Sequence, residues 1–144
     1  MITEAVIKLL QGLTDRPPRI ARLAQGANVL LHSRWFALEV PISFLAPEVE
    51  IDEETPIERV AWRTGLPPGE GEYAQATKGV TQGDLVPIVK LIAGCGVAVV
   101  HPAIYDLVMK QLPEPEFRVF EGERPHVAIL SSGIVVGAVA QIKE

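Results

Sequence analysis

The order of apolar patterns near the two ends of the chain constrains the fold most. Residues 3–40 and residues 103–142 each predict an amphipathic helix followed by three short strands. The two stretches share negligible residue identity, so they repeat an order of elements and not a sequence. Two such αβββ units can bury their apolar faces by joining their sheets edge to edge, with both helices on one face. The sequence therefore predicts an α+β fold with a mainly antiparallel sheet.

The N-terminal unit opens on a short helix. Thr3 is a typical N-cap, and Glu4 places a negative charge at the positive end of the helix dipole. The apolar stripe of this helix has three- and four-residue spacing and consists of Val6, Leu9, Leu10 and Leu13. Gly12 and the Pro17–Pro18 pair end it. The strands that follow are expected at 20–23, 29–32 and 35–40.

The C-terminal unit repeats this order. Pro102 can start a helix, and Pro113 ends it. The inward face of this helix is made of Ile104, Leu107, Val108 and Leu112. Three strands are predicted after it, at 117–120, 126–130 and 134–142, with turns at Glu121–Gly122 and Ser132–Gly133.

The middle of the chain has a different composition. Residues 46–80 are rich in proline and, in their first half, in acidic residues, which predicts a long connector with a loop at 65–71. A capping-box spacing from Thr81 to Asp84 precedes apolar residues at 85, 88, 89 and 92 and a glycine at 94, which predicts a further helix. The apolar run 97–100 predicts a buried strand. We expect a single domain over 1–144, with halves of roughly 1–45 and 81–144 joined by the connector 46–80.

Composition excludes several classes of protein. The 144 residues carry 13 basic and 18 acidic side chains, so the net charge is −5, unlike the basic face of a simple nucleic-acid binder. A single cysteine and the lack of a secretory start favour the cytoplasm. The apolar stretches 85–100 and 127–142 are interrupted by polar residues, glycine or proline, so no membrane span is expected.

One part of the chain resembles a known family. The run VAVVHPAIYDLVMKQLP at 97–113, followed by EFRVFEGERPHVAIL and GIVVGAVAQI, resembles a half-domain of the bacterial DNA polymerase processivity clamp, the β sliding clamp. The resemblance covers residues 97–142 and implies a clamp-domain-like fold and a role in DNA replication. A clamp subunit has three such domains, and its helices present several basic residues to the duplex. Here the first predicted helix offers Lys8, with Arg16 just beyond it, and the later helix offers Lys110. We therefore expect weak or no binding to duplex DNA.

No catalytic motif is found. Cys95 and His101 could form a thiol and a base, but Cys95 lies between two glycines at a predicted helix end, which favours a structural thiol. The three histidines are scattered and the acidic run lacks the glycine of a calcium loop, so neither a metal nor a cofactor is expected. An alternative remains, a small cytoplasmic enzyme with a site assembled from His101, Asp106 and Glu123.

The favoured function is a non-enzymatic protein-interaction module. The expected surface is centred on residues 46–72, because a long loop inside a compact domain is usually functional or disordered. Trp62 and Trp35 are the candidate anchors, and Asp52, Glu53 and Glu54 would steer a basic partner toward them. The expected partner is a polymerase-associated protein of the replication or transcription machinery. Self-association into a homo-oligomer and a phage or mobile element as the source complete this hypothesis.

Overall fold

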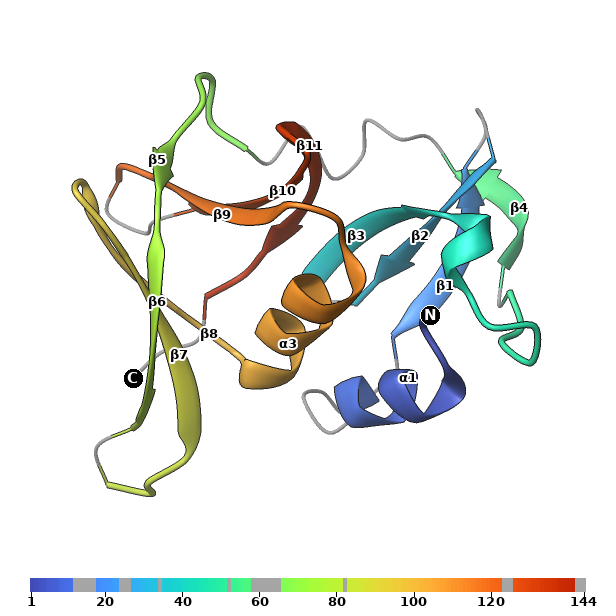
Figure 1. Ribbon diagram of the computed structural model, residues 1–144, viewed down its shortest axis with the longest axis horizontal. Helices are drawn as coiled ribbons and strands as arrows, with labels where there is room; N and C mark the ends of the chain where they lie inside the picture. Colours follow the sequence, from blue (N-terminus) through green and yellow to red (C-terminus); the bar gives the residue numbers. More distant parts are fainter. Residues whose placement is uncertain are drawn as a thin grey trace.

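The computed structural model describes residues 1–11, 18–23, 27–33, 35–51, 53–57, 66–81, 83–122 and 126–141. They form an eight-stranded sheet and a three-stranded sheet, with α1 and α3 beside them (Figure 1). The elements, in chain order, are α1 (Glu4–Gln11), β1 (Arg19–Leu23), β2 (Asn28–His32), β3 (Phe36–Pro41), a 3-10 turn (Ile42–Phe44), β4 (Glu53–Ile57), β5 (Glu72–Tyr73), β6 (Gln75–Val80), β7 (Pro87–Ala93), β8 (Gly96–Val100), α3 (Pro102–Gln111), β9 (Pro115–Phe120), β10 (His126–Ser131) and β11 (Ile134–Val139).

The eight-stranded sheet joins two three-stranded units at its centre. Its order is β4-β1-β2-β3-β11-β10-β9-β5, so the last strands of the two units, β3 and β11, lie side by side. They pair antiparallel, with Leu38 opposite Gly137 and Phe36 opposite Val139. All neighbouring strands in this sheet are antiparallel except β1 and β4. The prediction of two αβββ units with their sheets joined edge to edge in a mainly antiparallel sheet is confirmed.

Gly137 is required where the two units meet. A Cβ atom on this residue would lie 2.4 Å from the backbone carbonyl oxygen of Ala37 on the neighbouring strand. A backbone oxygen in a paired strand cannot move away without disturbing the ladder. Any side chain at this position would therefore push β11 away from β3.

Both helices cover the same face of this sheet, as the sequence predicts. Leu10 of α1 and Leu107 of α3 belong to one core cluster with Leu31, Leu38 and Ile129 from the sheet. The two helices also contact each other (Figure 1). The predicted N-cap of α1 is present, since the backbone N–H of Val6 donates to Thr3 Oγ1 over 3.3 Å. No helix among the described residues is long and apolar enough to cross a membrane.

The helix predicted between Leu85 and Ile92 is wrong, because strand β7 (Pro87–Ala93) occupies most of this segment. It pairs with β6 on one side and β8 on the other. Leu85 has a left-handed φ of 54° and is 67% exposed, so it cannot begin a helix. Thr81 closes the β6–β7 turn instead of capping a helix, since its hydroxyl accepts from the N–H of Val86 over 3.0 Å. The β-branched residues of this segment suit the strand.

The connector 46–80 contains more structure than the sequence predicts. It supplies β4 and β5, the two edge strands of the large sheet, and β6, an edge strand of the small sheet. The charges and the proline of β4 and the exposed side chains of β6 are typical of edge strands and leave no apolar alternation in the sequence. The predicted loop is confirmed for residues 66–71, which form neither strand nor helix.

Candidate functional site

Four strand ends meet at one end of the large sheet. There β3 begins, β11 ends, β10 begins and β9 ends, and the ladder sets Phe36, Val139, Val127 and Val119 in one row across the sheet. Residues 66–72, which belong to the connector 46–80, pass along the same region and line two pockets there. The candidate site therefore combines strand ends from both halves with the connector.

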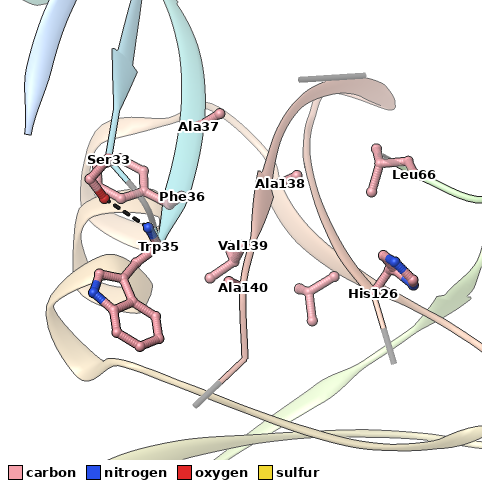
Figure 2. Close-up of a pocket in the computed structure, with 10 residues that line it drawn as sticks. Ser33, Trp35, Phe36, Ala37, Leu66, His126, Ala138, Val139 and Ala140 are labelled. Atoms are coloured by element: carbon pink, nitrogen blue, oxygen red, sulfur yellow. Dashed lines mark hydrogen bonds between the residues drawn. The ribbon is translucent and has the colours of Figure 1, made fainter. Parts of the chain in front are cut away.

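The first pocket, which we call the Trp35 pocket, has a volume of about 260 Å³ and mainly apolar walls. Figure 2 shows Trp35 and Phe36 on one side and Leu66 and His126 on the other, with the end of β11 between them. Its lining residues are Ser33, Trp35, Phe36, Ala37, Leu66, His126, Val127, Ala138, Val139 and Ala140. An open apolar hollow of this size suits an apolar side chain of another molecule.

Trp35 is held firmly in the wall of this pocket. Its carbonyl oxygen accepts from the N–H of Ala140 over 2.7 Å, and its N–H donates to Ser33 Oγ over 3.1 Å (Figure 2). Its indole packs edge-on against the His101 ring, with the ring centroids 5.5 Å apart at 81°. Burial lowers the pKa of His101, so its imidazole is neutral at neutral pH. The tryptophan is thus a preorganised, half-buried surface.

The second pocket, which we call the acidic pocket, has a volume of about 340 Å³. It is lined by Pro67, Pro68, Gly71, Glu72, Cys95, Val119, Phe120 and Glu121. Glu72 reaches over the β7–β8 turn, where its Oε2 lies 2.6 Å from the position that a Cβ on Gly94 would take. The glycine at 94 therefore leaves room for this carboxylate.

The Cys95 thiol lines the acidic pocket, and its pKa is raised there. Burial raises its pKa first, and the negative charges of Glu72 and Glu121 raise it further. The thiol donates a hydrogen bond to the carbonyl oxygen of Val119, with Sγ and O 3.4 Å apart. Because the thiolate is the nucleophilic form, these surroundings oppose thiol catalysis and agree with a structural thiol. The predicted helix end at Cys95 is instead the turn between two strands.

The two pockets adjoin each other. Leu66 lines the Trp35 pocket, and the next residue, Pro67, lines the acidic pocket. His126 of the Trp35 pocket stands opposite Phe120 of the acidic pocket in the β9–β10 ladder. Leu66 and Phe120 also belong to one small apolar cluster. Leu66 and Phe120 therefore mark the boundary between the apolar pocket and the acidic pocket.

The residues singled out from the sequence have different places. Trp35 lines the apolar pocket, whereas Lys8 on α1 and Lys110 on α3 are exposed. Glu53 and Glu54 lie on β4, at the opposite edge of the large sheet from β5. Outside the described residues are Trp62, Asp52, Arg16 and Glu123.

The alternative catalytic set of His101, Asp106 and Glu123 stays a prediction, because Glu123 lies outside the described residues. His101 faces the Trp35 indole, and Asp106 lies half-buried on α3. Among the described residues, no group of three or more His, Cys, Asp or Glu is placed to hold a metal ion. The sequence reasoning missed Glu72, Glu121 and His126, for which the loop at 65–71 and the turn at Glu121–Gly122 were the only local signals.

Comparison with protein-family models, with curated proteins and with solved structures found no significant match to this chain. The resemblance to a clamp half-domain thus depends on the residues of the run 97–142 alone. What the molecule does has to be argued from the two pockets.

Proposed function

We infer that this protein is a non-enzymatic protein-interaction module that binds an apolar side chain of a partner in the Trp35 pocket. The pocket itself is the observation that carries this proposal. Its volume of about 260 Å³ is smaller than the roughly 300–1,000 Å³ typical of small-molecule sites. A single apolar side chain, anchored in a partner segment, is a better match for such a hollow than a whole metabolite.

The composition of the walls supports the same function. Aromatic residues dominate the energetics of protein interfaces because they offer a large rigid area at low entropic cost. Half-buried Trp35 supplies such area, and Phe36, which is buried, adds to the apolar lining. Ser33 and His126 add polar groups. The Trp35 carbonyl oxygen accepts from the N–H of Ala140, and the Trp35 N–H donates to Ser33 Oγ. These bonds hold the Trp35 backbone in place before any partner arrives, which lowers the entropic cost of binding.

We propose that the partner is a polymerase-associated component of the DNA replication or transcription machinery. It rests on the clamp-like resemblance of residues 97–142 and is supported by the two αβββ halves with both helices on one face. Duplex DNA is not the proposed ligand, because the net charge is −5 and α1 and α3 expose one lysine each. Self-association remains part of the hypothesis.

The test is a variant that fills the pocket without removing its walls. Ala140 lines the pocket and is exposed, so Ala140→Phe would occupy the hollow. Ala5→Phe, on the exposed face of α1, is the matched control. A displayed library of random 12-residue peptides would be panned on the wild-type protein, and the affinity of selected peptides measured by fluorescence anisotropy.

Selected peptides with a shared apolar residue are expected, and Ala140→Phe should weaken them at least about tenfold while Ala5→Phe leaves them unchanged. Beads carrying the wild type and Ala140→Phe, incubated with host lysate, then test the partner class. A polymerase-associated protein retained only by the wild type supports the proposal. The absence of any selected peptide, or equal affinity for Ala140→Phe, contradicts it.

A further inference from the structure

The acidic pocket lies where a bound partner segment would continue. Resting on the proposed function, we propose that the segment bound in the Trp35 pocket carries a lysine or arginine whose cationic group enters the acidic pocket beside Glu72 and Glu121. The partner is then an extended segment with an apolar anchor and a nearby basic side chain.

The first step is that the two pockets form one continuous surface. Leu66 lines the Trp35 pocket, and the next residue, Pro67, lines the acidic pocket. His126 of the first pocket faces Phe120 of the second across the β9–β10 strand pair. Among the described residues, Leu66 of the Trp35 pocket and Phe120 of the acidic pocket belong to one apolar cluster at this boundary. A chain that leaves the Trp35 pocket across this boundary arrives at the acidic pocket.

The second step is charge complementarity. Glu72 and Glu121 line the acidic pocket, and none of its described lining residues is basic. Arg118, nearby on β9, is occupied by an ion pair with Glu116. Both glutamates are exposed and line this same hollow, so their negative charges add together there. A cationic side chain is the group that such a hollow stabilises.

The third step is spacing. The Trp35 pocket is built on β3, β11 and β10, and the acidic pocket on the end of β9. From β11 to β9 is two strand spacings, or about 10 Å, and an extended chain covers about 3.3 Å per residue. We therefore expect the basic residue of the partner about three positions along the chain from the apolar anchor.

The walls add selectivity for a side chain over a free ion. Pro67, Pro68 and Phe120 give the acidic pocket apolar sides around its two carboxylates. The aliphatic part of lysine or arginine can pack on such sides while its charged end meets the carboxylates. Arginine can in addition donate two parallel hydrogen bonds to one carboxylate.

The experiment uses the same random 12-residue peptide library on the whole protein. Glu72→Gln and Glu121→Gln remove one charge each with almost no change in shape, and Glu48→Gln, an exposed carboxylate elsewhere, is the matched control. Melting temperatures of all variants check that they are folded. Each selected peptide is also synthesised with its basic residue replaced by norleucine, which keeps the aliphatic part.

We expect selected peptides to carry lysine or arginine about three residues from the apolar anchor. Glu72→Gln and Glu121→Gln should each weaken these peptides about tenfold, and the norleucine peptides should bind all three proteins equally. Glu48→Gln should have no effect. Added salt should weaken the basic peptides more than the norleucine peptides.

The outcomes separate this inference from the proposed function. Selected peptides that are sensitive to Ala140→Phe but lack a basic residue, or that ignore both glutamine variants, overturn the basic-residue inference and leave the interaction module standing. No selected peptides at all overturns the proposed function itself. A concentration-dependent dimer that Ala140→Phe abolishes in analytical ultracentrifugation would make a second copy the occupant, which also overturns the inference.

Discussion

The two halves of the large sheet share an order of elements and differ in what is attached to their outer edges. In each half a helix precedes three antiparallel strands, and the third strands meet at the centre. The N-terminal half ends in the parallel strand β4, whereas the C-terminal half ends in the two-residue β5, beside the small sheet (Figure 1). The acidic pocket lies entirely on the C-terminal side. The elements that the two halves share form the core, whereas the acidic pocket belongs to the C-terminal edge, where the halves differ.

The first way to break this comparison is to truncate the equivalent core leucines. Leu10→Ala in α1 and Leu107→Ala in α3 each leave a cavity under the sheet, since these side chains are 2% and 3% exposed. Each should lower the free energy of unfolding by about 3 kcal/mol. Urea denaturation followed by circular dichroism measures this loss.

Leu9→Ala is the control, because Leu9 is 71% exposed and its loss should cost less than about 0.5 kcal/mol. Equal losses for Leu10 and Leu107 would support two equivalent halves that unfold together. A loss confined to one of the two variants would show that the halves do not share one core.

The second test acts on the joint between the halves. Gly137→Ala places a methyl group 2.4 Å from the carbonyl oxygen of Ala37, which should separate β11 from β3 and cost about 2 kcal/mol. Gly79→Ala, in strand β6, meets no atom within 4 Å and serves as the matched control. Urea denaturation would argue against this joint if the two alanine variants were equally stable.

A third test concerns the pH dependence of the contact between His101 and Trp35, which ties α3 to the start of β3. Burial lowers the pKa of His101 below its ordinary value of 6.5, so the unfolded chain binds the proton more readily than the folded one. The contribution of neutral His101 to the free energy of unfolding is therefore fully present above pH 6.5. It is lost as the pH falls from there through the pKa that His101 has in the folded protein. Thermal melts across this range should show the loss in the wild type.

His101→Gln should reduce this acid sensitivity, because glutamine cannot take up the proton. His126, which is exposed at the start of β10, provides the control variant His126→Gln. If His101→Gln and the wild type lost stability in parallel on acidification, the neutral imidazole would not be part of the joint.

A smaller effect is expected at Cys95, which distinguishes the C-terminal edge. Because burial and the charges of Glu72 and Glu121 raise the pKa of this thiol, iodoacetamide should alkylate the folded protein more slowly than the unfolded chain. Glu72→Gln should speed the reaction by about twofold to fivefold. Unchanged rates in Glu72→Gln, with Glu48→Gln as the reference, would show that this carboxylate does not act on the thiol.

The smallest effect is expected for duplex DNA, where the two helices offer one exposed lysine each. Binding should be weak and should disappear between about 50 and 200 mM salt. Lys8→Ala and Lys110→Ala should each reduce the small remaining affinity to a similar extent, as measured by anisotropy of a labelled duplex. Tight binding at physiological salt would contradict the charge argument from both halves.

The local sequence determined the helices, which have a cap or a proline at one end and an apolar stripe at helical spacing, and the strands with short apolar runs. Thr3 and the stripe of α1 predict that helix, and Pro102 with Leu107 predicts α3. The strands of both αβββ units also follow from short apolar runs between turn residues, although β11 ends at Val139 and not at 142. From the order of these elements the edge-to-edge sheet could be predicted, because two helices on one face bury the most apolar surface.

Only the tertiary structure decided the rest. The apolar residues at 85, 88, 89 and 92 match a helical stripe, but ladders to β6 and β8 make the segment a strand, since short apolar runs suit either structure. The edge strand β6 carries no apolar alternation and is defined by backbone pairing alone. The two pockets depend on Phe120 facing His126 and on Leu66 packing near them, which are contacts between distant residues. No local pattern encodes such contacts, because they exist only after the strands have paired.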